Sequence, residues 1–341
     1  LNMEQKDRKK ISIVISVYNE EKALAEFYRE ARPVFDALAW EYELLFVNDG
    51  STDGSRRILE ELAAKDRRIR VIHFSRNFGH EAAMLAGLDH ASGDGVVCMD
   101  ADLQHPPECV ADIIEKFEEG FEVVNMVRTR NRSAGWLKNV TSAAFYRVLN
   151  GISDVRLEPN ASDFFAVKAN AAQVLRRNYR EKVRFLRGYV QNIGFARTNL
   201  TYEARPRVAG ESKYSIRKLF KFSINTILCF SDLPLKLGIY SGMIVGFLGL
   251  LVMVNTIYEW AVHGTPNGYA TIVVLLCFMF AMLFVIVGII GEYIAILFAE
   301  LKDRPIYIIH DTQNMEETEQ TDQTAGEAAR KNAAANGLDN C

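Results

Sequence analysis

The sequence predicts an α/β fold with a mostly parallel sheet, followed by two membrane-spanning helices. Apolar, β-rich runs alternate with helical patterns from residue 11 to residue 126, and this alternation is typical of a parallel sheet with helices on both faces. Two charge-free segments, 237–258 and 269–291, are each long enough to cross a hydrocarbon core, which needs about 20 residues. The 341 residues leave room for one full α/β domain and a membrane anchor.

The soluble part of the chain alternates strands and helices in a regular order. Strands are predicted where short apolar runs occur, at 11–17, 42–47, 70–74, 96–99 and 122–126. Helices are predicted where apolar residues recur at helical spacing, at 20–38, 55–64, 81–91 and 106–119. Because such sheets bind ligands at the carboxyl ends of their strands, polar residues directly after strands are the candidate site.

The two apolar segments predict a membrane hairpin with its termini in the cytoplasm. Basic residues flank the pair on the outside: Lys213, Arg217, Lys218, Lys221 and Lys236 before it, Lys302 and Arg304 after it. The short connection 259–268 has no Lys or Arg, so the positive-inside rule places both termini and the large domain in the cytoplasm. The alternative is a pair of buried core helices in a soluble protein.

Composition narrows the class of protein further. The formal net charge is only −3, so a nucleic-acid partner is not expected. The five cysteines show no CxxC spacing, which predicts neither a zinc site nor a disulfide framework and fits a reducing compartment. The charged start of the sequence runs straight into a strand, so no signal peptide is expected.

Asp100 and Asp102 carry the clearest chemical signal. They end a short apolar strand, and their i, i+2 spacing puts both carboxylates on one side of an extended backbone. Two neighbouring carboxylates repel unless a cation lies between them, and Mg²⁺ or Mn²⁺ prefers such oxygen ligands. Asp-x-Asp also occurs in solvated turns. However, Tyr18-Asn19 and Asp49 follow two other predicted strands, so three polar clusters converge on one edge and favour a metal–diphosphate site.

Several segments together resemble glycosyltransferase family two, which has the GT-A fold, a Rossmann-like α/β fold. The matching segments are 16–21 (Ser-Val-Tyr-Asn-Glu-Glu), 47–55 (Val-Asn-Asp-Gly-Ser-Thr-Asp-Gly-Ser), 76–79 (Arg-Asn-Phe-Gly), 99–108 (Met-Asp-Ala-Asp-Leu-Gln-His-Pro-Pro-Glu), 185–188 (Phe-Leu-Arg-Gly), 209–214 (Ala-Gly-Glu-Ser-Lys-Tyr) and 291–293 (Gly-Glu-Tyr). The last three are similar to the polyprenyl-phosphate glycosyltransferase branch, which includes dolichol-phosphate mannose synthases. The resemblance covers about residues 10 to 307.

The resemblance implies roles for the residues at the strand ends. The nucleotide-binding set is Tyr18, Asn19, Glu20, Asp49 and Asp100, and the metal set is Asp102 and Gln104, with Mg²⁺ or Mn²⁺ as cofactor. Asp49 has an alternative role as a turn residue before Gly50. His105, which precedes two prolines, is interpreted as structural.

Asp163 is the third expected catalytic carboxylate, beside Asp100 and Asp102. It matches a family position that commonly reads Gly-Asp-Phe, whereas here Ser162 precedes it, and the continuation Ala166-Val167-Lys168 also departs from the family pattern. These departures concern the shape of the acceptor or sugar pocket. Asp163 is expected to be either a base or a group that positions a sugar hydroxyl.

The acceptor implied by the resemblance is a polyprenyl phosphate at the membrane. A phosphate monoester is largely a dianion at neutral pH, because its second pKa is about 6, so it needs cations rather than a base. The candidate cations are Arg128, Arg130, Arg132, Arg205, Arg207 and Lys213. The same basic residues suit a surface attracted to anionic lipid, and both roles are compatible.

These expectations divide the chain into segments. They are a cytoplasmic GT-A domain (1–210), interfacial amphipathic helices (211–234), a first transmembrane helix (235–260), a short non-cytoplasmic loop (261–268), a second transmembrane helix (269–299) and a cytoplasmic tail (300–341) that is disordered from about 316. A further amphipathic stretch, 136–149, is expected on the membrane surface or over the site. The partners are a nucleotide sugar, the lipid phosphate and the membrane, and a homo-oligomer is left open.

The function expected is inverting transfer of one sugar from a UDP- or GDP-sugar to the lipid phosphate, for modification of cell-envelope glycans. A processive polysaccharide synthase is disfavoured, because none of Trp40, Trp136 and Trp260 follows Gln-x-x-Arg. A non-enzymatic membrane adaptor is the alternative from another class, and intact Asp49, Asp100 and Asp102 argue against it. A lipid-sugar flippase would have only two helices for its path.

Overall fold

The computed structural model describes residues 8–129, 158, 161–182, 184–205, 233–263 and 268–315. Within them, eight strands form one sheet in the order β7-β5-β6-β4-β1-β2-β3-β8. The strands are β1 (Lys10–Val17), β2 (Glu41–Asn48), β3 (Ile69–Phe74), β4 (Gly95–Asp100), β5 (Val123–Arg128), β6 (Ala161–Lys168), β7 (Arg197–Tyr202) and β8 (Ile309–Gln313). The helices are α1 (Glu21–Asp36), α2 (Ser55–Lys65), α3 (His80–His90), α4 (Cys109–Glu118), α6 (Ala169–Asn178), α7 (Leu186–Asn192), α9 (Leu233–His263) and α10 (Tyr269–Leu301).

The centre of the sheet is parallel, as the alternating pattern predicts. Strand β1 pairs in parallel with β2 and with β4, and β2 pairs in parallel with β3. In this register Ser16 lies opposite Asp100, and Val17 lies opposite Asn48. The carboxyl ends of the three strands β1, β2 and β4 therefore lie side by side at one edge.

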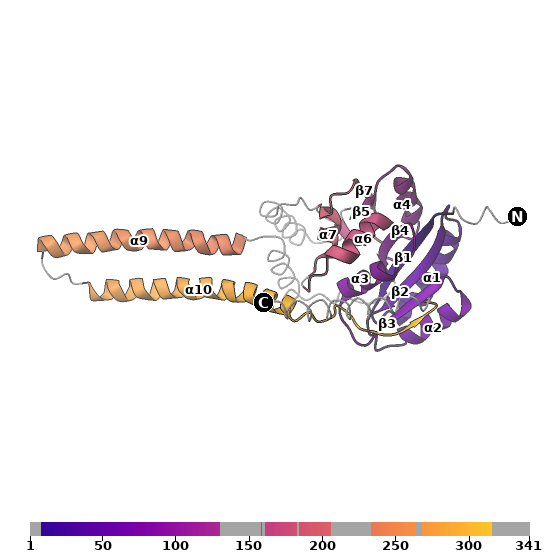
Figure 1. The fold of residues 1–341 in the computed structure, drawn as a ribbon, viewed down its shortest axis with the longest axis horizontal. Coiled ribbons are helices and arrows are strands. Elements are labelled where there is room, and N and C mark those ends of the chain that lie inside the picture. The colour runs from indigo at the N-terminus through magenta and orange to yellow at the C-terminus, as the bar shows by residue number, and fades with distance from the viewer. Residues whose placement is uncertain are drawn as a thin grey trace, which may run out of the picture.

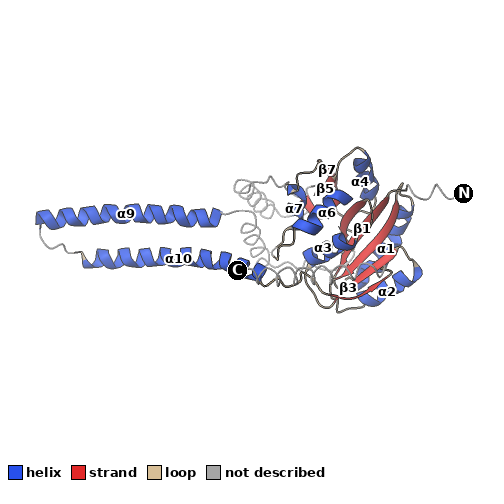
Figure 2. Ribbon diagram, in the orientation of Figure 1, coloured by secondary structure: helices blue, strands red, loops and turns tan. Residues whose placement is uncertain are grey.

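Helices cover both faces of the sheet (Figures 1 and 2). Phe27 and Phe35 of α1 belong to one buried cluster, together with residues of α2 and α4. Helices α3, α6 and α7 contribute to the cluster on the other face. Helix α3 lies so close to the sheet that a Cβ atom at Gly87 would be 2.0 Å from a methyl carbon of Val14. The α/β class predicted from the sequence is thus confirmed.

Strand β6 was not predicted from the sequence, and it changes the sheet. It lies between β4 and β5 and runs antiparallel to both, so the sheet is mixed rather than wholly parallel. Strand β7 then pairs in parallel with β5 at the far side. The insertion of β6 next to β4 brings Asp163 to the strand end that carries Asp100, although 62 residues separate them in the sequence.

Strand β8 returns to the α/β domain after the second apolar helix. It pairs antiparallel with β3 at the other edge of the sheet, and Tyr307, just before it, stacks on Phe74 with ring centroids 5.1 Å apart. The Tyr307 hydroxyl donates to Asp89 on α3, and Arg56 of α2 forms an ion pair of 2.8 Å with Asp311. The residues after α10 therefore form part of the domain.

Helices α9 and α10 lie side by side and project away from the sheet (Figure 1). Each contains a window long and apolar enough to cross a membrane by length and composition, Gly238–Tyr258 with mean hydropathy 1.8 and Phe278–Leu301 with mean hydropathy 2.4. Only 6% of the first window and none of the second is buried in the chain. These two helices are therefore not buried core helices, which was the alternative for these segments.

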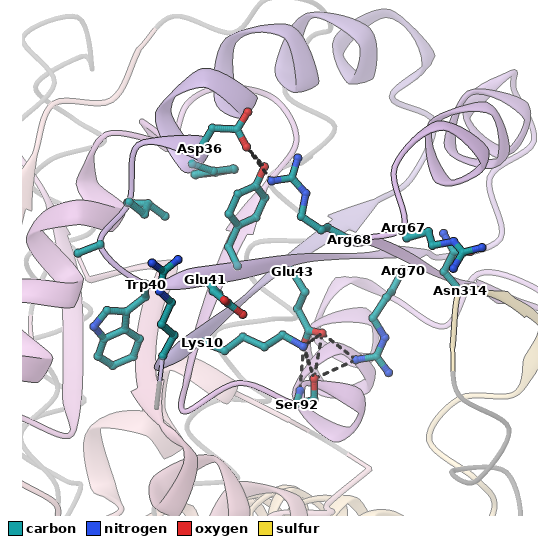
Figure 3. A pocket seen from close by; sticks show the side chains of 15 residues that line it. Lys10, Asp36, Trp40, Glu41, Glu43, Arg67, Arg68, Arg70, Ser92 and Asn314 are labelled. Atoms are coloured by element: carbon teal, nitrogen blue, oxygen red, sulfur yellow. Dashed lines mark hydrogen bonds and ion pairs between the residues drawn. The ribbon is translucent and has the colours of Figure 1, made fainter. Parts of the chain in front are cut away.

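Glu43 is a buried carboxylate at the opposite pole of the sheet, where β1, β2 and β3 begin. It lines a cavity of about 740 Å³ together with Lys10, Arg70 and Ser92 (Figure 3). The Lys10 ammonium lies 2.6 Å and the Arg70 guanidinium 3.1 Å from its Oε2, and Ser12 donates to its Oε1. Burial raises the pKa of Glu43, but these partners outweigh it and lower the pKa to about 2.

We expect Glu43 to stabilise the fold in a pH-dependent way. Its pKa in the folded chain lies below the ordinary value of 4.5, so the stabilisation is full above pH 4.5 and is lost as the pH falls toward 2. Glu43→Gln should lower the free energy of unfolding at pH 7 by about 2–4 kcal/mol. Denaturant unfolding of the detergent-solubilised protein at pH 7 and pH 3 measures this loss, with exposed Glu41→Gln as the control. Equal stability of both variants at pH 7 would contradict the assignment.

Candidate active site

The loop after β1 and the loop after β2 are joined by hydrogen bonds. After β1, the Asn19 amide donates to Ser51 Oγ at 3.0 Å, and the Glu20 amide donates to Ser55 Oγ at 2.9 Å. In return, the Asn19 side chain accepts from the Thr52 amide at 2.8 Å. Asn19 takes a left-handed backbone conformation (φ 56°), which a short polar side chain tolerates. The expected nucleotide-binding residues 18–20 thus lie against the loop that follows Asp49.

Asp49 organises a third loop with both of its carboxylate oxygens. It is buried, its Oδ1 accepts from the Phe78 amide at 2.6 Å, and its Oδ2 accepts from the Gly79 amide and the Asn77 side chain, both at 2.9 Å. Burial raises the pKa of Asp49, although the two backbone amides oppose that rise. The side chain is therefore more than a turn residue, because it holds the Arg-Asn-Phe-Gly loop in place.

Gly50 permits the close crossing of these loops. Its φ is 63°, and a Cβ atom there would lie 2.4 Å from the carbonyl carbon of Arg76. Tyr18, at the neighbouring strand end, is 38% exposed. The strand-end surface therefore combines backbone loops in tight contact with an accessible aromatic ring.

Asp100 is held at the end of β4 by two neighbours. Its Oδ1 accepts from the Ser16 hydroxyl at 3.2 Å, and its backbone amide donates to His105 Nδ1 at 3.0 Å. The His105 ring is buried and stacks on Phe164 with centroids 4.9 Å apart. Burial lowers the pKa of His105 in spite of the nearby carboxylates, so the ring is neutral at pH 7 and has a structural role.

Asp102 and Gln104 lie in a strained turn directly after this strand. The backbone amide of Gln104 donates to Asp102 Oδ1 at 3.0 Å. Leu103, between them, is buried and has a positive φ of 60°. A left-handed conformation is costly for a leucine and persists only where the surrounding structure holds it. Carboxylate and amide oxygens are the donor set that Mg²⁺ and Mn²⁺ prefer, so the residues present fit such an ion.

Arg128, at the end of β5, is the one expected phosphate-binding residue that the described structure places beside this turn. Its guanidinium donates to Gln104 Oε1 at 3.4 Å, and its buried Nε has no hydrogen-bond partner among the described residues. Arg205 instead lies between Glu30 and Glu108, at 3.2 and 2.8 Å. Arg130, Arg132, Arg207 and Lys213 lie outside the described residues, as do the amphipathic stretch 136–149, most of 211–234 and the tail from 316.

Asp163 reaches the same edge from β6. In the antiparallel register of β4 and β6, Cys98 pairs with Phe165, and two further residues along each strand set Asp163 opposite Asp100. Arg187 Nε lies 3.1 Å from its Oδ1, and His80 Nε2 lies 3.9 Å from its Oδ2. Burial raises the pKa of Asp163, but Arg187 and His80 outweigh it and lower the pKa below its ordinary value. The carboxylate is therefore ionised and weakly basic at neutral pH.

Three site residues were not singled out from the sequence: Ser16, His80 and Arg187. Ser16 and Arg187 belong to the family motifs 16–21 and 185–188, and His80 directly follows the motif 76–79. These motifs indicated the family, but they did not indicate which of their residues contact the acids. Burial lowers the pKa of His80, but the carboxylates of Asp100 and Asp163 raise it, and the rise prevails. The site thus consists of three acids with His80, Arg128 and Arg187 among them.

Comparison with known proteins identifies the class. A family model described as Glycosyl transferase family 2 matches residues 12–178. The chain is 41% identical over 306 residues to the uncharacterized glycosyltransferase YkcC of Bacillus subtilis, covering 89% of this chain and 94% of that protein. It is 36% identical over 301 residues to the bactoprenol glucosyl transferase of Shigella phage SfII, covering 88% and 97%. The chain therefore belongs to glycosyltransferase family 2 and is a glycosyltransferase.

A solved structure resembles the chain more distantly. It is glucosyl-3-phosphoglycerate synthase from Mycobacterium tuberculosis in complex with Mn²⁺, UDP-glucose and phosphoglyceric acid. The TM-score is 0.44 at 20% identity, over 64% of this chain and 78% of that one. The family predicted from the sequence is confirmed by the Bacillus subtilis and Shigella phage relatives, and that assignment does not depend on this structural likeness.

We expect Asp49→Asn to loosen the loop that contains Phe78 and Gly79, because one of the two acceptor oxygens is replaced by a donor. The free energy of unfolding should fall by about 1–3 kcal/mol. Hydrogen exchange at the amides of Phe78 and Gly79, followed by mass spectrometry, measures the local effect. Asp53→Asn, in the adjacent turn, is the matched control and should leave these amides protected. Unchanged exchange in Asp49→Asn would show that the carboxylate does not hold the loop.

Proposed function

We propose that this glycosyltransferase moves one sugar from a nucleoside diphosphate donor to a polyprenyl phosphate at the cytoplasmic face of a membrane. The observation that carries the proposal is the match to bactoprenol glucosyl transferases over 301 residues. A match of this length extends beyond the residues that precede Leu233 and into the apolar helices. The acceptor is accordingly a phosphate carried by a lipid, and the product serves the modification of cell-envelope glycans.

The donor half of the site binds the nucleotide and its diphosphate. Tyr18, Asn19, Glu20 and Asp49 surround the nucleoside, with Asp100 near the ribose. Asp102 and Gln104 hold Mg²⁺ or Mn²⁺, which neutralises the charge that develops on the leaving nucleoside diphosphate. The buried Nε of Arg128, beside Gln104, has no hydrogen-bond partner among the described residues. It supports an anionic ligand here, because an orphaned buried donor is costly unless a ligand satisfies it.

The acceptor half binds and orients rather than deprotonates. The lipid phosphate is largely a dianion at neutral pH, so its oxygen can attack the anomeric carbon without a base. The lowered pKa of Asp163 supports the same division of work, since an efficient base has a pKa near the working pH. We therefore assign Asp163 to a sugar hydroxyl, and one displacement from the face opposite the leaving group inverts the configuration.

Cations guide the lipid phosphate into the site. Arg128 lies at the site, and we assign Arg130, Arg132, Arg207 and Lys213 to the same acceptor surface by their place in the sequence. Arg205 joins them only if a ligand competes with its ion pairs to Glu30 and Glu108. Such surface pairs contribute little, about 0–1 kcal/mol, so a phosphate dianion is able to displace them.

The two apolar helices anchor the catalytic domain. The exposure of α9 and α10 in the isolated chain supports burial in lipid, and the basic residues on both outer flanks support a hairpin with cytoplasmic termini. The protein is then a multi-pass protein of the cell membrane with its active site on the cytoplasmic side. A homo-oligomer remains compatible with this arrangement.

The transfer assay tests the proposal directly. Purified full-length protein in detergent is incubated with undecaprenyl phosphate, Mn²⁺ or Mg²⁺, and a panel of labelled UDP- and GDP-sugars. We expect lipid-extractable label with one donor and an inverted anomeric configuration in the product, determined by NMR. Absence of transfer with every donor by folded protein would overturn the acceptor assignment.

The metal assignment has its own test. Asp102→Asn should reduce kcat by at least about 100-fold, because the amide no longer neutralises or holds a divalent ion. Asp112→Asn, on the surface of α4, is the control and should retain the parent rate. Binding of Mn²⁺, measured by electron paramagnetic resonance in the presence of the nucleoside diphosphate, should weaken only in Asp102→Asn. Full metal-dependent activity in that variant would exclude Asp102 as a ligand.

A further inference from the structure

His80 lies where the donor side and the β6 side of the site meet. It is the first residue of α3 and follows Gly79, whose φ of 100° makes a sharp entry into the helix. Asp49 binds the amides of Phe78 and Gly79 just before it, and the Gly79 carbonyl accepts from the Ala82 and Ala83 amides just after it. The backbone at His80 is therefore fixed from both directions.

The first nitrogen of the His80 ring is tied to Asp100 through Ser16. Nδ1 lies 2.8 Å from Ser16 Oγ and 3.7 Å from Asp100 Oδ1, and the Ser16 hydroxyl donates to that same Oδ1 at 3.2 Å. A serine hydroxyl has one hydrogen, so Oγ must accept the second bond, and His80 Nδ1 donates it. The ring thus orients Ser16, and Ser16 orients the carboxylate.

The second nitrogen of the ring faces Asp163. Nε2 lies 3.9 Å from Asp163 Oδ2, whereas the other oxygen of Asp163 is held by Arg187 at 3.1 Å. His80 and Arg187 therefore flank this carboxylate, one at each oxygen. Along with Ser16, they connect two acids that come from strands far apart in the sequence.

We infer that His80 is a positioning residue for the transfer, which fixes Asp100 and Asp163 relative to each other across the reacting sugar. This inference rests on the proposed function, in which Asp100 serves the donor and Asp163 orients a sugar hydroxyl. Because Asp49 holds residues 77–79 without help from the His80 side chain, loss of that side chain leaves this loop in place. The same loss lowers the rate of the chemical step.

Two amide substitutions separate the two nitrogens of the ring. In His80→Asn the amide occupies the place of Nδ1, so the link to Ser16 is kept and the reach to Asp163 is lost. In His80→Gln the amide extends toward the place of Nε2, so the reach to Asp163 is kept and the link to Ser16 is lost. His310→Ala, on β8 and outside the site, is the matched control.

The experiment measures kcat and the donor KM for each variant in the transfer assay. We expect kcat to fall about 10- to 100-fold in His80→Ala, and less in His80→Asn and His80→Gln, because a small misplacement of reacting groups has effects of this size. The donor KM should change less than about threefold, since binding in the ground state is retained. Parent-like kcat in His80→Asn would overturn the inference, because that variant keeps the link to Ser16 but cannot reach Asp163.

A double-variant comparison tests whether His80 acts through Asp163. His80→Ala should lower kcat far less in an Asp163→Asn background than in the parent, because neighbours that act as a unit are not additive. Fully multiplicative losses would overturn the inference. Unfolding midpoints of the parent, the two single variants and the double variant, measured without added metal, give a readout independent of activity. The destabilisation of the double variant should be smaller than the sum of the two single effects.

The failure of this inference is distinguishable from the failure of the proposed function. If the parent protein transfers no sugar to the lipid phosphate, the proposed function and the inference built on it are both overturned. If the parent is active and His80→Ala retains its kcat, the function stands and only the role of His80 is overturned.

Discussion

The parallel register of β1 between β2 and β4 is the constraint on which the site depends. It sets Ser16 level with Asp100 and Val17 level with Asn48, so the loops that carry the polar residues begin at the same height. A slip of one residue would turn each strand-end side chain to the other face of the sheet. Buried residues on both faces of β1 exclude such a slip, because one helix layer packs on Ile13 and Ile15 and the other on Val14.

The electrostatics of the site follow from bringing three acids to this edge. Neighbouring carboxylates repel, and the fold offsets part of that repulsion with Arg187 at Asp163, Arg128 at Gln104 and His80 between Asp100 and Asp163. Carboxylate and amide oxygens gathered in this way are a donor set that suits a divalent ion.

The sequence was sufficient for the parts of the fold that repeat a simple pattern. The alternation of apolar runs and amphipathic helices predicted the strands and helices from β1 to β5 and the family motifs at their ends. It did not predict β6, whose partners are distant in the sequence, or β8, whose residues Ile-His-Asp-Thr-Gln show no apolar alternation and gain their strand from pairing with β3. For the candidate site, spacing and resemblance singled out Asp100, Asp102 and Gln104, which the structure places at one strand end. Two features could not be predicted in this way: Asp49 holds the loop of residues 77–79, and His80 lies between Asp100 and Asp163. Both depend on contacts between segments that are distant in the sequence.

The return of the chain to β3 after α10 makes the hairpin an insertion within the catalytic sheet. Strand β7 precedes the two apolar helices in the chain and β8 follows them, yet both belong to one sheet. During synthesis the edge of β3 therefore stays open until both helices have left the ribosome, since chains fold as they emerge from the N-terminus. An open edge is a site for unwanted strand pairing, and β8 closes it. Pairing of β8 with β3 therefore waits until both apolar helices have been synthesised.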